Sequence, residues 1–209
     1  MTTQPDIEAV FTRADGTFLF AKWHRPIAPV IFGVDDATLP VLKGALEAIV
    51  MLAGHQMAET DPELGSNLMM FFVRDWTELR DVPDLGRLIP GLSDILDRLE
   101  AADANQYRVF RFEEDGAIRA ASAFVRMDAH MSDAPAEALA LGQAVQLILL
   151  WSDTAFTDHP ALVQAEDGSF LLRPSLASLI RAAYDPLIPV MSQDAALSYR
   201  LAARLGGVQ

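Results

Sequence analysis

The chain has 209 residues, of which 51% are hydrophobic and 22% are charged, so it can form a sizeable core and is not disordered throughout. Its formal net charge of −13 argues against binding to nucleic acid or to anionic membrane surfaces, because both kinds of binding depend on cationic side chains. It contains no cysteine, which excludes disulfides, thiolate metal sites and a cysteine nucleophile.

The N-terminal residues lack the basic segment and apolar run of a secretory signal. Uninterrupted apolar stretches such as Leu147–Trp151 are far shorter than the roughly 20 residues that a membrane span needs. We therefore expect a soluble, cytoplasmic protein. Its length and the lack of repeats or low-complexity linkers favour one domain that covers residues 1–209.

The chain begins with a predicted hairpin and a further strand. Two β-prone runs, Val10–Arg13 and Thr17–Trp23, flank an Asp-Gly turn signal at residues 14–16. The run Ala28–Gly33 then predicts a strand bounded by prolines.

A long helix and a buried strand follow. Apolar residues at helical spacing predict a helix that starts at Asp35 or Asp36 and ends near Gly54. The continuous apolar run Asn67–Val73 has the length of a strand that is buried on both faces. Residues 75–105 then predict an insertion made of short helices.

The second half of the chain predicts a hairpin followed by helices. Tyr107–Glu113 and Ala117–Met127 flank a second Asp-Gly turn signal at residues 114–116. A long helix is predicted over Ala134–Trp151, with Asp133 as its cap and a proline in its first turn. After a loop rich in aspartate, a helical tail is predicted at about 174–205, with helices near Pro174–Tyr184 and Gln193–Leu205. The predicted fold class is α+β, with a mixed sheet and two long helices.

The helix over residues 134–151 carries two unexplained glutamines. From Leu139 onward, Gln143 and Gln146 are its only polar side chains before Ser152. A helix that is apolar nearly all round belongs in a core, and residues three apart lie on one face. The two glutamines therefore either line a binding site or bond to each other, to the backbone or to buried water.

Three other groups could carry chemistry, each with a structural alternative. The most ligand-like local cluster comprises His55, Glu59 and Asp61, and its alternative is a solvated loop. His159 has Asp153 and Asp158 nearby, with the same alternative. Trp23 and Arg25 flank His24; exposed, this segment could hold an anion, whereas Trp23 could instead belong to the core.

Motifs for metal, nucleotide and hydrolase chemistry are missing from the sequence. No two of the four histidines have a metal-ligand spacing on one helix. The chain also lacks a phosphate-binding loop, a dinucleotide-binding turn and the nucleophile elbow of hydrolases.

The predicted order is strand, long helix, strand, insertion, hairpin, long buried helix and helical tail, which resembles the zincin metallopeptidases. Short strings are similar to a proteobacterial family of unknown function, whose members have been suspected of being zinc-protease relatives. These strings are Trp-His-Arg-Pro-Ile at residues 23–27, Gln146 upstream of Asp153, and Leu176 through the Tyr-Asp-Pro at residues 184–186. The similarity spans roughly residues 18–200.

The resemblance implies a degenerate metal site. In the zincin register, Gly142 and Gln146 take the two histidine positions and Gln143 takes that of the general-base glutamate, with Ser152 or Asp153 near the third ligand position. Glycine offers no ligand, a glutamine carbonyl binds zinc weakly, and Gln143 cannot accept a proton from a metal-bound water. We therefore expect no metal, no cofactor and no catalytic residue.

The leading hypothesis is a non-catalytic, peptidase-like domain that binds a peptide or protein partner in a cleft beside an edge strand. Its expected binding residues are Gln143, Gln146, Trp151, Asp153, Trp23 and Arg25. The alternatives are a hydrolase that uses histidines and carboxylates outside the long helix, and a small-molecule binding module lined by Trp23, Trp151 and the two glutamines. A chain this apolar is also compatible with a homodimer, although no sequence feature identifies the interface.

Overall fold

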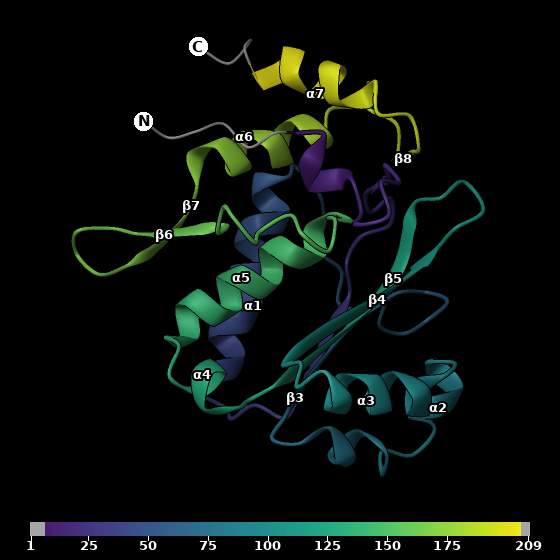
Figure 1. Cartoon of the computed structure of the whole chain (residues 1–209), viewed down its shortest axis with the longest axis vertical. Helices are drawn as coiled ribbons and strands as arrows, with labels where there is room; N and C mark the ends of the chain where they lie inside the picture. The colour runs from purple at the N-terminus through teal and green to yellow at the C-terminus, as the bar shows by residue number, and fades with distance from the viewer. Residues whose placement is uncertain (1–6, 206–209) are drawn as a thin grey trace.

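The fold is built around a four-stranded mixed sheet with the strand order β2-β3-β5-β4 (Figure 1). The computed structural model describes residues 7–205. The strands are β2 (Pro29–Phe32), β3 (Leu68–Val73), β5 (Ile118–Arg126) and β4 (Gln106–Phe112). The first three are parallel and β4 runs antiparallel to β5, so β4 forms one edge of the sheet. The α+β class and the mixed sheet expected from the sequence are confirmed.

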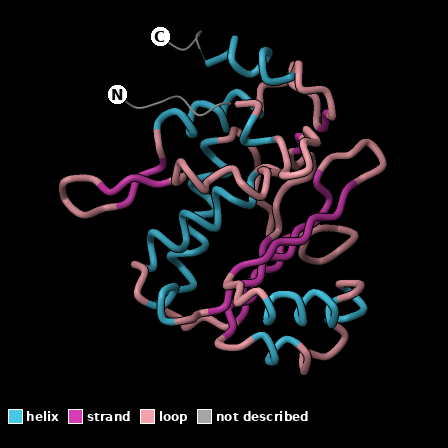
Figure 2. Tube along the Cα trace, viewed as in Figure 1, coloured by secondary structure: helices cyan, strands magenta, loops and turns pink. Residues whose placement is uncertain are grey.

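Helices cover both faces of this sheet (Figures 1 and 2). On one face, α1 (Thr38–Leu52) packs against α5 (Ala136–Ile148). On the other lies the insertion, with η2 (Trp76–Leu79), α2 (Leu85–Leu88) and α3 (Leu92–Ala101). Because strand side chains alternate between faces, Met70 and Phe72 of β3 join the α1–α5 core, whereas Phe71 and Val73 join the core of the insertion. A strand buried on both faces explains the continuous apolar run of the sequence.

Glycine is required where β2 ends. Gly33 has a φ of +79°, and a Cβ added there would lie 1.8 Å from the carbonyl oxygen of Phe72. Only glycine allows the backbones to approach so closely in this left-handed conformation. The chain then enters α1, where the Asp35 carboxylate accepts a hydrogen bond of 2.7 Å from the backbone N–H of Thr38.

The predicted N-terminal hairpin forms only in part. Its turn is present, since the Arg13 N–H donates to the Thr17 carbonyl, but residues Ala9–Phe11 form the 3-10 helix η1 instead of a strand. Val10 and Phe11, whose hydrophobic side chains suggested a strand, are buried in the core as part of this helical turn. Strand β1 (Phe20–Ala21) pairs with β8 (Met191–Ser192).

The glutamine-bearing helix is shorter than predicted. Asp133 ends the short helix α4 (Ala129–Ser132) instead of capping α5, whose N-cap is Pro135. At the other end, Leu149 is extended and forms an isolated bridge with Lys22. The helix thus ends before Trp151, and the residues that follow bond to the N-terminal segment: the Leu150 N–H donates to the Ala21 carbonyl and the Ser152 N–H to the Val10 carbonyl.

The C-terminal part contains α6 (Pro174–Ala183), α7 (Leu197–Leu205) and a hairpin that the sequence had suggested only as a loop. The hairpin pairs β6 (Leu162–Gln164) with β7 (Phe170–Leu172) and projects from the body of the molecule (Figure 1). Across residues 7–205, each helix is too short or too polar to cross a membrane.

Lys22 anchors the end of α6 to the body of the protein. Its buried ammonium donates to the carbonyl oxygens of Ala183 at 2.8 Å and Ile188 at 2.9 Å, and to that of Asp185 at 3.4 Å. The same nitrogen lies 5.5 Å from the centre of the Tyr184 ring. A cation at this position satisfies carbonyl groups that a helix end leaves without partners.

Candidate functional site

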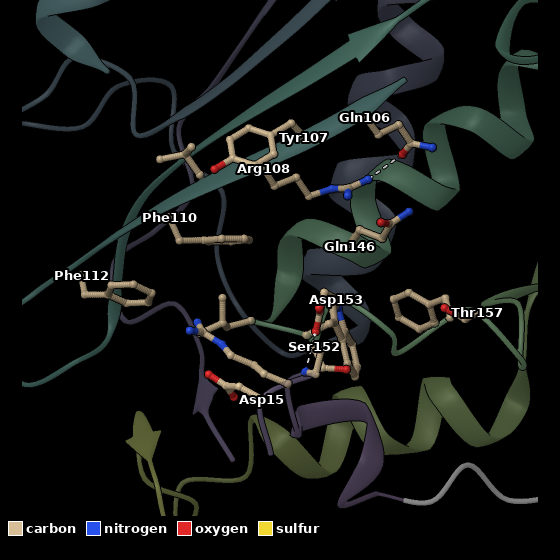
Figure 3. A pocket seen from close by; sticks show the side chains of 16 residues that line it. Asp15, Gln106, Tyr107, Arg108, Phe110, Phe112, Gln146, Ser152, Asp153 and Thr157 are labelled. Atoms are coloured by element: carbon tan, nitrogen blue, oxygen red, sulfur yellow. Dashed lines mark hydrogen bonds between the residues drawn. The ribbon is translucent and has the colours of Figure 1, made fainter. Parts of the chain in front are cut away.

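A cleft of about 950 Å³ lies between the edge strand β4 and the end of α5. One wall is β4, from Gln106 to Phe110 together with Phe112. The other is formed by Gln146 of α5 and by residues from the segment that follows the helix, 150–153 and 156–157. The turn at residues 13–15 closes one end. Figure 3 shows these side chains around the opening.

The cleft follows the edge of β4 and does not merely touch one face of the strand. Alternate side chains of a strand point to opposite faces of its sheet. The cleft is nevertheless lined by five consecutive residues, Gln106 to Phe110, and these include Tyr107 and Val109, which pack toward the insertion. A space that touches both sets of side chains must run along the strand edge, where backbone groups have no neighbouring strand.

Arg108 and three glutamines form the polar floor of this cleft. Arg108 Nη2 donates to Gln106 Oε1 at 2.7 Å and to Gln143 Oε1 at 3.2 Å, and Gln143 Nε2 donates to Gln106 Oε1 at 2.8 Å. Gln143 is therefore satisfied and only 2% exposed, whereas Gln146, one turn later, lines the cleft. Side chains of Gln106, Arg108 and Phe110 extend from β4 toward the α5 side (Figure 3).

Aromatic side chains form the opposite wall. The Trp151 indole is stacked on Phe11, with ring centres 5.3 Å apart and planes 8° apart, and meets Phe156 edge-on. Its ring N–H donates to the Val145 carbonyl at 2.8 Å. These contacts fix the ring in place, so Trp151 provides a rigid apolar surface at the cleft.

Charges of both signs surround the opening. Asp153 accepts a hydrogen bond of 3.2 Å from the backbone N–H of Ala14, which ties the turn at residues 13–15 to the opposite wall. A backbone hydrogen bond from Thr17 lowers the pKa of Asp15, so this carboxylate stays ionised near neutral pH. The lining thus holds two arginines, Arg13 and Arg108, against two aspartates.

The structure brings together some of the expected binding residues and separates others. Gln146, Trp151 and Asp153 line the cleft, and Gln143 lies directly beneath it. Trp23 does not reach the cleft, because its ring is buried and donates to the Leu147 carbonyl at 2.7 Å. Arg25 lies elsewhere and pairs with Glu113 at 2.5 Å and Glu63 at 3.1 Å. Both residues therefore have structural contacts and no place in the cleft.

The histidine–carboxylate cluster after α1 is also structural. Asp61 is buried and accepts hydrogen bonds from the backbone N–H groups of Glu63 and Leu64 and from Asn67. Burial opposes this charge, but the hydrogen bonds prevail and lower its pKa. His55 Nε2 bonds to the Arg25 carbonyl at 2.7 Å, and Glu59 is exposed. None of these three residues lines the cleft, so the structure does not bring them together with Asp153, as the hydrolase alternative requires.

Residues that could hold a zinc ion are not assembled at α5. The Gln143 carbonyl oxygen already accepts from Arg108, whose positive charge opposes a nearby metal cation. A Cβ on Gly142 would face Leu162 of β6 at 4.0 Å. Within residues 7–205, no three histidine or carboxylate side chains are grouped closely enough to hold a metal ion. Gly142, Gln143 and Gln146 do not form a donor set that fits a zinc ion.

Sequence reasoning missed the β4 side of the site. Arg108 could have indicated this side of the site from the sequence alone. It shares a strand face with Phe110, so a charged side chain occupies a position where an apolar one is expected. The positions of Gln106 and Arg13 follow only from the assembled fold.

No family model matches this chain, and no similar protein was found among the curated proteins or the solved structures.

Proposed function

We propose that this protein is a non-catalytic binding domain that takes up an extended peptide segment of a partner along the edge of β4. The observation that carries the proposal is the course of the cleft, which follows the strand edge over consecutive residues. A peptide added there gains main-chain hydrogen bonds from the strand and side-chain contacts from the cleft. Trp151 and Phe110 would provide apolar contacts, and Arg108 and Gln146 polar ones.

The zincin resemblance supports the same reading. The zincin clefts that the sequence resembles bind extended peptides along a sheet edge, and the cleft proposed here also lies beside an edge strand, β4. The glutamines and the arginine in the floor of the cleft provide neither zinc ligands nor a general base. A peptide-binding groove does not require zinc ligands or a general base. Purified protein should therefore carry no stoichiometric zinc in metal analysis, and a tightly held zinc ion would contradict the proposal.

A filled cleft tests the function directly. Gln146→Trp places a large side chain into the opening, whereas Gln164→Trp makes the same change on the exposed strand β6. Decapeptides selected from a random library for binding to the wild-type protein are labelled and followed by fluorescence anisotropy. We expect the first variant to weaken binding by at least about ten-fold, or about 1.4 kcal/mol, and the second to leave it unchanged.

Hydrogen exchange provides the second readout. A bound peptide should slow the exchange of backbone amides in β4, because amides at the strand edge become hydrogen-bonded. Selected peptides that bind Gln146→Trp as tightly as the wild type, or that leave β4 exchange unchanged, would place the binding surface elsewhere.

A small-molecule binding module is the second candidate, and the cleft volume of about 950 Å³ favours it. Such a volume lies within the range of ligand pockets. The two candidates differ in extent: a small molecule would perturb Trp151 and its neighbours, whereas a peptide would protect β4 along its whole length.

A further inference from the structure

Arg108 is a half-buried arginine at the cleft that lacks an acidic partner. Arg25, Arg126 and Arg204 each lie within salt-bridge distance of a carboxylate. The hydrogen bonds that Arg108 makes go to the neutral amides of Gln106 and Gln143. Its Nε is buried and has no hydrogen-bond acceptor among the described residues. Burial also lowers the pKa of Arg108 to about 10, so the group stays charged at neutral pH without a counter-charge.

A buried guanidinium without an anion is costly to maintain, and a ligand carboxylate would relieve that cost. Guanidinium has five N–H donors in a planar fork that fits the two oxygens of a carboxylate. Nη2 uses its two bonds on the glutamines, and the side chain lines the cleft. The glutamines hold the fork in place while leaving its charge uncompensated.

We propose that Arg108 is a specificity residue that binds the aspartate or glutamate side chain of an extended peptide lying along β4. The inference rests on the proposed peptide-binding function and names the chemical class of its ligand. The cleft supports one such carboxylate and not an acidic tract, because Asp15 and Asp153 line its other parts.

The position of Arg108 favours an acidic side chain over a terminal carboxylate. Arg108 lies inside β4, and the cleft continues beyond it toward Gln106 in one direction and Phe110 in the other. A peptide that fills the cleft must therefore extend past Arg108 on both sides. Because alternate residues share a face, the side chain two positions from the acidic residue would meet Phe110 and should be apolar.

A second copy of this chain fits the edge less well than a foreign peptide. Two β4 strands paired about a two-fold axis near their centres would bring two Arg108 guanidinium groups together, and each copy carries a net charge of −13. Both features oppose self-pairing at this edge. A short segment with one carboxylate satisfies Arg108 and brings no second guanidinium.

Paired peptides test this assignment. The probes are capped decapeptides with a phenylalanine two positions after either glutamate or glutamine, and with random residues elsewhere; the tightest binders are then resynthesised as matched pairs. We expect the glutamate form to bind the wild-type protein about ten-fold tighter or more. Arg108→Met should lower the affinity of the glutamate form to that of the glutamine form, so that the variant no longer distinguishes the two peptides.

Two further variants separate recognition from folding. Arg111→Met removes an arginine from the opposite face of the same strand, where it bonds to the Leu88 carbonyl, and should preserve the glutamate preference. Arg108→Lys keeps the positive charge without the fork and should retain part of that preference. Circular dichroism and urea unfolding establish that each variant is folded.

The outcomes distinguish this inference from the function on which it rests. Equal affinity for both peptide forms, with β4 amides protected by each, would overturn the carboxylate assignment and leave the peptide cleft intact. A glutamine peptide with a free C-terminus that matches the glutamate peptide would overturn the choice of a side-chain carboxylate. If no probe protects β4, the proposed function fails as well. A dimer in size-exclusion chromatography that covers the β4 edge would assign that edge to a second copy.

Discussion

Lys22 is a buried cation and Arg108 is a half-buried cation at the cleft, and the two differ in what surrounds them. Lys22 donates to the Ala183 and Ile188 carbonyls at 2.8 and 2.9 Å and is only 6% exposed. Arg108 shares one nitrogen between two neutral glutamines and leaves its buried Nε without an acceptor among residues 7–205. The first environment is complete and holds two distant segments together. The second leaves a guanidinium charge beside the cleft with only neutral hydrogen-bond partners.

The comparison separates structural charges from charges available for binding. A buried donor with all its acceptors contributes to folding, and its loss leaves those acceptors unsatisfied. A buried charge without a counter-charge opposes folding and gains stability from an anion that binds beside it. Lys22 fits the first description and Arg108 the second, so substitution of Lys22 should mainly reduce stability and substitution of Arg108 should mainly reduce binding.

Removal of the Lys22 ammonium should cause the largest loss of stability. Lys22→Met keeps much of the side-chain volume but deprives the carbonyls at the end of α6 of their donor. We expect the free energy of unfolding to fall by about 3 kcal/mol, as measured by urea denaturation. Lys43→Met, on α1, removes an exposed cation and is the matched control, with an effect below about 0.5 kcal/mol. A Lys22→Met variant as stable as the wild type would show that the Lys22 ammonium does not stabilise the fold.

Arg108→Met should change stability much less. The substitution removes an uncompensated charge, and the bond between Gln143 and Gln106 can remain. We therefore expect the free energy of unfolding to stay within about 1 kcal/mol of the wild type, with a shift in either direction. If Arg108→Met lowers the free energy of unfolding as much as Lys22→Met does, Arg108 is itself a structural residue and does not differ from Lys22 in this respect.

The sequence predicts the elements around the sheet better than it predicts the site. Strand β3 and helix α1 follow from hydrophobic spacing, because burial on both faces or on one helical stripe leaves a regular pattern. The 3-10 helix at Ala9–Phe11 was mistaken for a strand, since three residues with two apolar side chains carry no period. The hairpin of β6 and β7 was missed although Asp167 and Gly168 form a turn signal, because its strands are only three residues long.

The site depends on contacts that sequence separation conceals. The glutamine pair identified the correct helix, but the end of α5 is set by pairing between Leu149 and Lys22, which are distant in the chain. After that pairing, Trp151 and Asp153 lie at the cleft. Trp23 lies in the core, where its ring N–H donates to the Leu147 carbonyl. Local patterns could not distinguish these outcomes, since both tryptophans follow apolar runs.

The smallest expected effect concerns His55, whose pKa is lowered mainly by burial and to a lesser degree by His24 and Lys22. Its ring contacts the Tyr184 ring, with centres 5.3 Å apart, and the same Tyr184 ring lies near the Lys22 ammonium. Burial lowers the pKa of His55, and the nearby His24 and Lys22 add to this effect, although the bond to the Arg25 carbonyl opposes it. Between the folded pKa and about 6.5, the unfolded chain binds the additional proton. The contribution of the neutral His55 ring to the free energy of unfolding is therefore fully present above about pH 6.5. It decreases as the pH falls from about 6.5 toward the folded pKa.

Urea unfolding of the wild type and of His55→Gln at pH 5, 6 and 7 measures this contribution. Most carboxylates are ionised in both states over this range, so the difference between the two proteins isolates the imidazole. The wild type should lose less than about 1.4 kcal/mol per pH unit relative to the variant. Lys22→Met should weaken the dependence, because one cause of the lowered pKa is gone. If the pH dependence of stability is the same in Lys22→Met as in the wild type, the Lys22 charge does not affect the pKa of His55.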